Sequence, residues 1–218
     1  GKGFDIEKIV YKGIYEHFKK NLFESVTSFT DKVYEKGHNK VALINAFITG
    51  KSNSHLSIPQ IQRICEITGT TFEENAYLKA AAVTAVTGLP AVADDSGLAV
   101  DALDGAPGIY SARYAGEHGN DKLNREFLLK NLEGEENRKA KFASSVVLYK
   151  TDDSFIEGCG ETHGTILFKE EGENGFGYDS LFFSTDLNKS FGVASSEEKN
   201  AVSHRYRALV DLYNKIEK

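Results

Sequence analysis

Two carboxylates, a hydroxyl and a glycine follow one another at Asp94-Asp95-Ser96-Gly97. The apolar run Ala91-Val92-Ala93 precedes them and predicts a short strand that leads directly into the acidic pair. Adjacent carboxylates cannot both be buried in an apolar core, because an unpaired buried charge is very costly. At a strand end they can instead hold Mg²⁺, whose coordination shell a phosphate group completes. An acidic turn is the alternative, and this stretch alone does not decide between the two.

Further charged residues precede this acidic pair. Thr71 to Glu74 has the spacing of a capping box, which gives Glu74 a structural role as the alternative to a catalytic one. Glu73 is interpreted as a solvated helix residue. Lys79 lies among alanines and is either a surface lysine or a ligand of a phosphate group.

A second group of residues suits a nucleotide base. The segment Asn174-Gly-Phe-Gly-Tyr-Asp179 contains Phe176, Gly177, Tyr178 and Asp179. Its glycines allow the backbone to approach a ligand closely, and an aromatic ring can stack on a purine. A tight hairpin connection with a half-buried phenylalanine is the alternative reading of this segment.

Basic side chains near the C-terminal end form the third group. Lys199, His204 and Arg205 can donate hydrogen bonds to a carbonyl oxygen of a base and can place positive charge beside a phosphate. Taken singly, each of them is better explained as a surface residue. The sequence has no Walker loop, no nucleophile elbow and no Cys/His metal spacing.

The elements that must position these groups mix helices and strands. Ser195 to Glu198 predicts a capped helix that continues to the C-terminal end. Strands are expected at 91–93, 98–101, 140–149 and 154–168, and helices at 5–36, 57–67, 71–87 and 120–133. The short apolar run at 41–48 fits either a strand or a helix. Together these elements predict an α/β (α+β mixed) fold with a mixed sheet.

Charge and cysteine content narrow the functional classes. The 218-residue chain has a net charge of −6, which argues against broad binding to nucleic-acid backbones. No apolar run has the length of a membrane span. Two cysteines, Cys65 and Cys159, provide no disulfide framework, so we expect a cytoplasmic protein.

Taken together and in order, these segments resemble the inosine triphosphate pyrophosphatase family. The segments that carry the resemblance are Thr68–Ala76, Ala93–Leu98, Gly105–Tyr114, Asn174–Asp179, Glu197–Asn200 and Ser203–Arg205. The family removes ITP, dITP and XTP from the nucleotide pool as a hydrolase acting on acid anhydrides. The resemblance spans about residues 66–217 and implies a long mixed sheet flanked by helices in two lobes, with the active site in a cleft, and a homodimer.

The resemblance also implies roles for individual residues. Asp95 is expected to bind Mg²⁺ and to accept a proton from water, with Asp94 in support, and Glu66 is expected to be a second metal ligand. The purine nucleoside triphosphate is expected to contact the remaining residues, which are Ser96, Phe176, Gly177, Tyr178, Asp179, Lys199, His204 and Arg205.

The N-terminal part departs from the family pattern. Family members carry a Thr/Ser-x-Asn-x-x-Lys loop that binds the triphosphate, and the nearest candidate, Phe47 to Asn53 with Lys51, has its Asn and Lys in the opposite order. We therefore expect residues 1–56 to be an atypical, mostly helical segment and residues 57–218 to be the pyrophosphatase-like domain. An alternative function is a catalytically impaired nucleotide-binding protein that uses its N-terminal helices to bind a partner.

Overall fold

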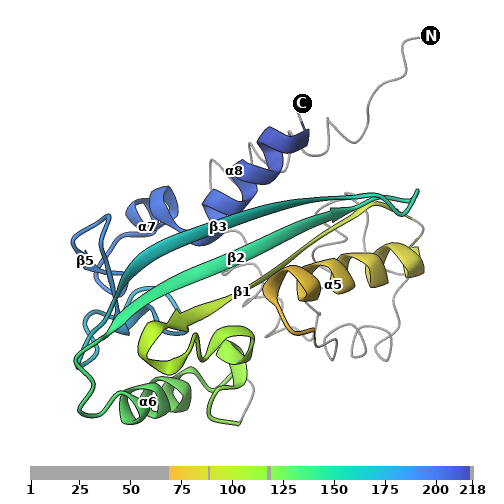
Figure 1. The fold of residues 1–218 in the computed structure, drawn as a ribbon. Helices are drawn as coiled ribbons and strands as arrows, with labels where there is room; N and C mark the ends of the chain where they lie inside the picture. The colour runs from red at the N-terminus through yellow and green to blue at the C-terminus, as the bar shows by residue number, and fades with distance from the viewer. Residues whose placement is uncertain (1–68, 88, 117–118, 217–218) are drawn as a thin grey trace. The chain divides into compact units, whose positions relative to one another are not determined.

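A computed structural model of the chain describes residues 69–87, 89–116 and 119–216. The helices predicted at 5–36 and 57–67, the apolar run at 41–48, the segment with Lys51, and Glu66 lie outside the described residues. The strands form a five-stranded sheet in the order β1-β2-β3-β4-β5, with helices beside it (Figure 1). The expected α/β class, with helices flanking a sheet, is confirmed.

The first described helix, α5 (Phe72–Thr87), begins where the sequence predicts. The Thr71 hydroxyl accepts a hydrogen bond from the N–H of Glu74 at 3.1 Å, as expected of an N-cap. The Glu74 carboxylate accepts from the N–H and the hydroxyl of Thr70 instead of the N–H of Thr71. Of the two roles that the sequence left open for Glu74, structural or catalytic, the contacts at this helix end support the structural one.

Strand β1 (Ala91–Val100) differs from the expectation of two separate short strands at 91–93 and 98–101. It runs without interruption through Asp94-Asp95-Ser96-Gly97, so the acidic pair lies in the middle of a strand and the strand-end placement is wrong. Asp94, Asp95 and Ser96 are all half-buried. The contacts of Asp95 described below explain how a carboxylate is kept at this position.

The central hairpin consists of β2 (Lys139–Tyr149) and β3 (Phe155–Ile166). The N–H of Lys150 donates to the carbonyl of Ser154 at 2.9 Å and closes the turn between these two strands, which the sequence predicted at 140–149 and 154–168. Strand β3 pairs antiparallel with β4 (Phe182–Ser184), and β4 pairs antiparallel with β5 (Lys189–Ser190).

Three further helices complete the described chain. α6 (Asp121–Asn131) lies where the sequence predicted a helix at 120–133, and Asn120 caps it by accepting a hydrogen bond from the N–H of Leu123. The single C-terminal helix that the sequence predicted is two helices, α7 (Ser196–Val202) and α8 (His204–Ile216). Ser203 separates them in an extended conformation, with ψ 149°. None of the helices in the described ranges combines the length and the apolar character that crossing a membrane requires.

The chain forms two compact units, and β1, β2 and β3 each pass from one unit into the other. Of the described residues, unit 1 holds those from Gly69 to Asp95, Ser145–Cys159 and those from Ala208 to Ile216, and unit 2 holds those within Ser96–Ser144 and Gly160–Arg207. The boundary on β1 falls between the consecutive residues Asp95 and Ser96.

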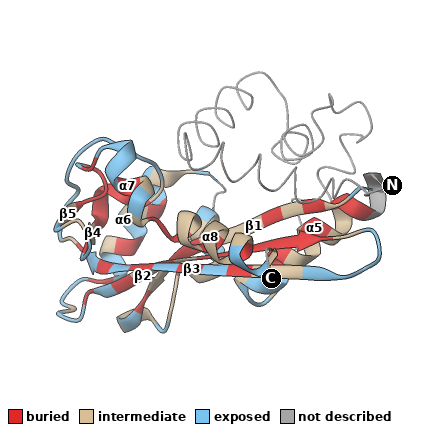
Figure 2. Ribbon diagram, turned by 90° about the horizontal axis from the view of Figure 1, so that it is seen from above, coloured by how far each residue is buried: buried red, intermediate tan, exposed pale blue. Residues whose placement is uncertain are grey.

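Unit 1 packs helices against both faces of β2. Val147 and Tyr149 belong to an apolar cluster with α5, whereas Val146 and Leu148 belong to a cluster with Ala208 and Leu212 of α8. Because neighbouring strand residues point to opposite faces, this part of β2 is buried on both sides, as the red ribbon in Figure 2 shows.

Unit 2 has its own apolar core, which joins β1, α6, β2 and the segment after β3. Its buried residues include Leu98, Leu128, Phe142, Phe182 and Phe191. The rings of Phe142 and Phe182 lie 4.7 Å apart and those of Phe182 and Phe191 lie 5.1 Å apart, between centroids. This core supports the aromatic and basic residues that the sequence associated with a nucleotide base.

Candidate active site

The carboxylate of Asp95 is held by two side chains of α5. Asn75 and Lys79 are four residues apart on this helix and therefore lie on one face of it. The Asn75 amide donates to Asp95 Oδ2 at 3.0 Å, and the Lys79 ammonium is paired with Asp95 Oδ1. Lys79 also donates to the main-chain oxygen of Asp94 at 3.2 Å. The sequence left the role of Lys79 open, and the structure places it against the acidic pair.

The environment of Asp95 changes its protonation equilibrium. Burial raises the pKa of Asp95 above its ordinary value, while the charge and hydrogen bond of Lys79 and the hydrogen bond of Asn75 act in the opposite direction. The nearby Asp94 contributes a smaller increase in the pKa of Asp95. A desolvated carboxylate of this kind accepts a proton more readily than an exposed aspartate.

Asp94 and Asp95 are neighbours in one strand, so their side chains point to opposite faces. This geometry separates the two carboxylates that the sequence treated as a pair. The main-chain oxygen of Asp94 accepts a hydrogen bond from the same Lys79 ammonium that is paired with Asp95.

The donor set around Asp95 is compatible with a divalent cation. An ionised carboxylate offers about four lone-pair positions, and the contacts with Lys79 and Asn75 use two of them. The remaining positions are hard oxygen donors of the type that Mg²⁺ prefers. Glu66, the second metal ligand that the resemblance implied, lies outside the described residues.

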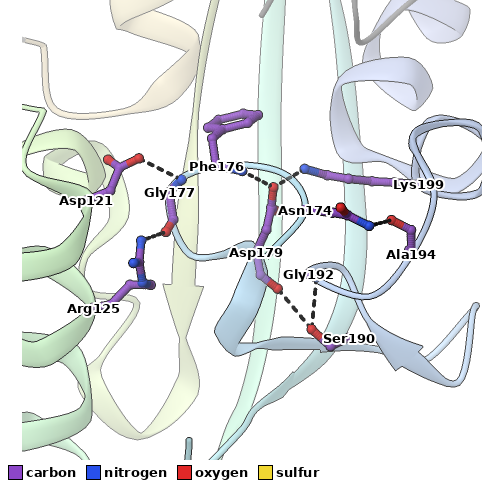
Figure 3. Close-up of polar contacts among 10 residues, drawn as sticks. All are labelled: Asp121, Arg125, Asn174, Phe176, Gly177, Asp179, Ser190, Gly192, Ala194 and Lys199. Atoms are coloured by element: carbon purple, nitrogen blue, oxygen red, sulfur yellow. Dashed lines mark hydrogen bonds and ion pairs between the residues drawn. The ribbon is translucent and has the colours of Figure 1, made fainter. Parts of the chain in front are cut away.

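In unit 2, Asp179 organises the loop from Gly172 to Tyr178 (Figure 3). Its side chain is only 4% exposed, and Oδ2 accepts a hydrogen bond from the N–H of Phe176 at 2.8 Å. The same oxygen is paired with the ammonium of Lys199, which extends from α7. A buried Asp–Lys pair therefore lies directly beneath Phe176.

Phe176 is 39% exposed, whereas Lys199 is buried. The Lys199 ammonium lies 4.7 Å from the centroid of the Phe176 ring, within the range of a cation–π contact. Burial lowers the pKa of Lys199, and the charge and hydrogen bond of Asp179 partly offset this effect. The partly exposed Phe176 ring is therefore held in place by the buried Lys199 ammonium beside it.

Tyr178 lies in the core rather than on the surface of the loop. It is 4% exposed, and its hydroxyl donates to the main-chain oxygen of Ser111 at 2.9 Å. Burial raises the pKa of Tyr178, so its phenol remains protonated. This residue anchors the loop, and Phe176 is the more exposed aromatic ring of the two.

The break at Ser203 separates the basic residues. Lys199 belongs to α7, and His204 and Arg205 belong to the first turn of α8. Arg205 donates to the hydroxyl of Ser96 at 3.0 Å, and the buried His204 ring stacks on Phe142 with centroids 5.0 Å apart. A continuous helix, as the sequence predicted, would place these three side chains differently.

The structure thus forms two groups from the residues that the sequence singled out. Asp95 with Lys79 and Asn75 belongs to unit 1, and Asp95 is followed directly by Ser96, the first residue of unit 2. The unit 2 residues are Ser96, Phe176, Gly177, Tyr178, Asp179, Lys199, His204 and Arg205.

The residues that contact these groups and were not predicted from the sequence include Asn75 of α5 and Asp121 and Arg125 of α6. Asn75 had a usable signal, because it lies four residues before Lys79 in a predicted helix. Asp121 and Arg125 of α6 both contact Gly177, and their spacing is also four residues. Nothing local connects α6 to a loop more than fifty positions later, so these two contacts required the structure.

Comparison with known proteins places the chain among related sequences. The chain is 55% identical over 155 residues to a dITP/XTP pyrophosphatase of Haemophilus influenzae, covering 69% of this chain and 80% of the relative. It is 44% identical over 184 residues to a dITP/XTP pyrophosphatase of Geobacter sulfurreducens, covering 83% and 92%. The solved structure of the Staphylococcus aureus Ham1 protein is similar, with a TM-score of 0.66 and 43% identity over 69% of this chain and 78% of that one.

A sequence model of the Ham1 family matches residues 26–215, which extends the likeness toward the N-terminal end beyond Glu66. The match includes both groups of site residues. This chain therefore belongs to the Ham1 family.

Proposed function

We propose that this protein hydrolyses deaminated purine nucleoside triphosphates, namely ITP, dITP and XTP, to the monophosphate and pyrophosphate. The observation that carries the proposal is the desolvated Asp95 carboxylate, fixed by Lys79 and Asn75. Relatives that are 55% and 52% identical and bear the name dITP/XTP pyrophosphatase support the same activity.

Asp95 has two tasks in this proposal. It would hold Mg²⁺, with Glu66 as a further ligand, and the metal would neutralise charge on the phosphates. Its carboxylate would also accept a proton from the attacking water, for which its raised pKa is suitable. Asp94 supports this position through its main-chain oxygen, which accepts from Lys79. The Lys79 ammonium keeps a positive charge beside the place where negative charge accumulates.

The base would bind to unit 2. The partly exposed Phe176 ring offers a surface on which a purine can stack. Asp179 holds this residue through its N–H, and Lys199 contacts its ring. Arg205, fixed by Ser96, supplies donors for the 6-carbonyl oxygen of a deaminated purine, and His204 supports the same turn through its stacking on Phe142. Adenine carries an amine at this position, so the donors of Arg205 would remain unpaired against it, and such mismatches discriminate strongly.

Release of pyrophosphate from dITP, with and without added Mg²⁺, tests this function against simple nucleotide binding. We expect Mg²⁺-dependent release from dITP, ITP and XTP and much weaker release from dATP. Tight binding of dITP without release would instead identify a nucleotide-binding protein that has lost catalysis. The resemblance further supports a homodimer, and sedimentation velocity would show it as twice the mass of the 24.0 kDa chain.

A further inference from the structure

Helix α6 contacts the Phe176 loop through two side chains that lie on one face of the helix. Asp121 Oδ2 accepts a hydrogen bond from the N–H of Gly177 at 2.8 Å. The guanidinium of Arg125, four residues later, donates to the carbonyl oxygen of Gly177 at 2.9 Å. Figure 3 shows the two side chains extending from α6 to opposite sides of this one residue. One helix therefore fixes both peptide groups that flank Gly177.

These contacts combine with the contact of Asp179 on the preceding residue. The N–H groups of Phe176 and Gly177 are bonded to the carboxylates of Asp179 and Asp121, respectively. Three successive peptide groups around the Phe176 ring are thus each bonded to an ionisable side chain, and hydrogen bonds to charged groups are stronger than neutral ones.

The loop needs such external bonds because glycines flank the ring. Gly175 and Gly177 have φ values of +81° and +59°, which glycine adopts readily. Because glycine has many other accessible conformations, these two residues alone do not fix the backbone of the loop. A hollow of ≈ 360 Å³ adjoins the loop from Gly172 to Gly177, and Asp121, Arg125 and Glu170 also line it. On the side of the loop that faces α6, polar contacts and not close packing therefore hold the backbone in place.

Arg125 is itself held in place. Its Nε lies 3.1 Å from the carboxylate of Glu170, and Glu170 also accepts a hydrogen bond from the hydroxyl of Ser180 at 2.9 Å. Although burial acts in the opposite direction, the bonds from Arg125 and Ser180 keep the pKa of Glu170 below its ordinary value. The network thus links α6 to both ends of the loop.

We propose that Asp121 and Arg125 are positioning residues that fix the Phe176 ring in the orientation in which it stacks on the purine base. This inference rests on the proposed function for the identity of the ligand. The positioning itself rests only on the contacts of Gly177. Neither side chain needs to touch the substrate for this role.

The composition of the chain provides a direct probe of the ring. The sequence contains no tryptophan, so Phe176→Trp places a single indole at this position. Asp121→Ala, Asp121→Asn and Arg125→Lys are then introduced into this background. Asp121→Asn loses the favourable charge at the helix N-terminus, as Asp121→Ala does, but keeps an oxygen that can accept from Gly177. Glu126→Ala removes another carboxylate of α6, one that is 58% exposed, and is the matched control.

The readouts are the fluorescence anisotropy of the indole without ligand and its quenching by inosine 5′-monophosphate. We expect lower anisotropy in Asp121→Ala, with a Kd for the nucleotide raised about three- to tenfold, the size of effect that losing one hydrogen bond produces. Asp121→Asn should stay close to the parent and Glu126→Ala should equal it. For dITP hydrolysis by the variants that retain Phe176, KM should rise more than kcat falls.

Two results would overturn parts of this account separately. Unchanged anisotropy in Asp121→Ala, or an equal decrease in Glu126→Ala, would overturn the positioning role. The expected anisotropy pattern without any quenching by the nucleotide would leave the positioning intact and would contradict the assignment of Phe176 to the base. Circular dichroism melting of each variant verifies that the comparison is made between folded proteins.

Discussion

The ammonium of Lys79 is paired with the carboxylate of Asp95, and the two side chains are only 29% and 17% exposed. A helix residue and a strand residue sixteen positions apart thus keep a positive and a negative charge together in a partly desolvated place. This relationship is the basis for the catalytic role assigned to Asp95.

Lys79→Ala should shift the acid limb of the pH–rate profile to higher pH. Lys79 lowers the pKa of Asp95 against the increase caused by burial, so its removal leaves the carboxylate protonated over a wider pH range. We also expect kcat to fall by about 10–100-fold through the lost charge. The check is kcat/KM for dITP between pH 5 and 9, with Lys122→Ala, an exposed lysine, as the control. An acid limb that does not move would show that Asp95 does not control this titration.

Asp179→Ala should destabilise the fold far more than removal of an exposed acid. The change leaves the buried Lys199 ammonium without its partner, which typically costs about 3–5 kcal/mol. Asp186→Ala breaks an exposed pair with Arg207 and should cost no more than about 1 kcal/mol. Urea denaturation of both variants measures the difference. Adding Lys199→Met to Asp179→Ala should recover part of the stability, and equal losses for the two single variants would contradict the buried pair.

Cys159 should react slowly with thiol reagents although it is exposed. Partial desolvation of the sulfur and the charges of Glu157 and Glu73 raise the pKa of this thiol to about 11, so little thiolate is present at pH 8. In a Cys65→Ser background, alkylation by iodoacetamide should be about 100-fold slower in the folded protein than in urea at pH 8. The folded rate should keep rising up to about pH 11, whereas a rate that is half-maximal near pH 8.5 and levels off by about pH 10 would show an ordinary thiol.

Arg205→Ala should reduce the preference for ITP over ATP, because the variant loses a donor to the 6-carbonyl. The difference in activation free energy between the two nucleotides, taken from kcat/KM, should shrink by about 1–3 kcal/mol. Arg207→Ala is the matched control on the same helix, since Arg207 contacts Asp186 and the main chain of Glu161. Values of kcat/KM for both nucleotides give the result. An equal loss for ITP and ATP would place Arg205 on the phosphates or in the fold instead.

Local signals in the sequence predicted several elements correctly. The Thr71 and Asn120 caps mark the starts of α5 and α6, because a cap depends on a few neighbouring residues. The hairpin of β2 and β3 was equally local. Ser195 also caps a helix as expected, but the break at Ser203 was missed because nothing near this residue, such as a proline or glycine, indicates it.

Contacts between distant segments were the part that the sequence could not provide. The continuous path of β1 through Asp94 and Asp95 depends on Lys79 and Asn75 from another element, and strand propensity alone argues for a turn there. The support of Gly177 by α6 likewise depends on tertiary packing. The site residues themselves could therefore be predicted from the sequence. Of the side chains that hold them in place, only some had a signal in the sequence.

The replacement Asp95→Asn tests the central claim most directly. It keeps the size of the side chain and an acceptor oxygen, but it removes the charge that would hold Mg²⁺ and accept a proton from water. We predict that pyrophosphate release from dITP at saturating Mg²⁺ falls by at least about 10³-fold in kcat, while the thermal unfolding curve shows a folded protein. Turnover near that of the parent in a folded Asp95→Asn protein would contradict the account.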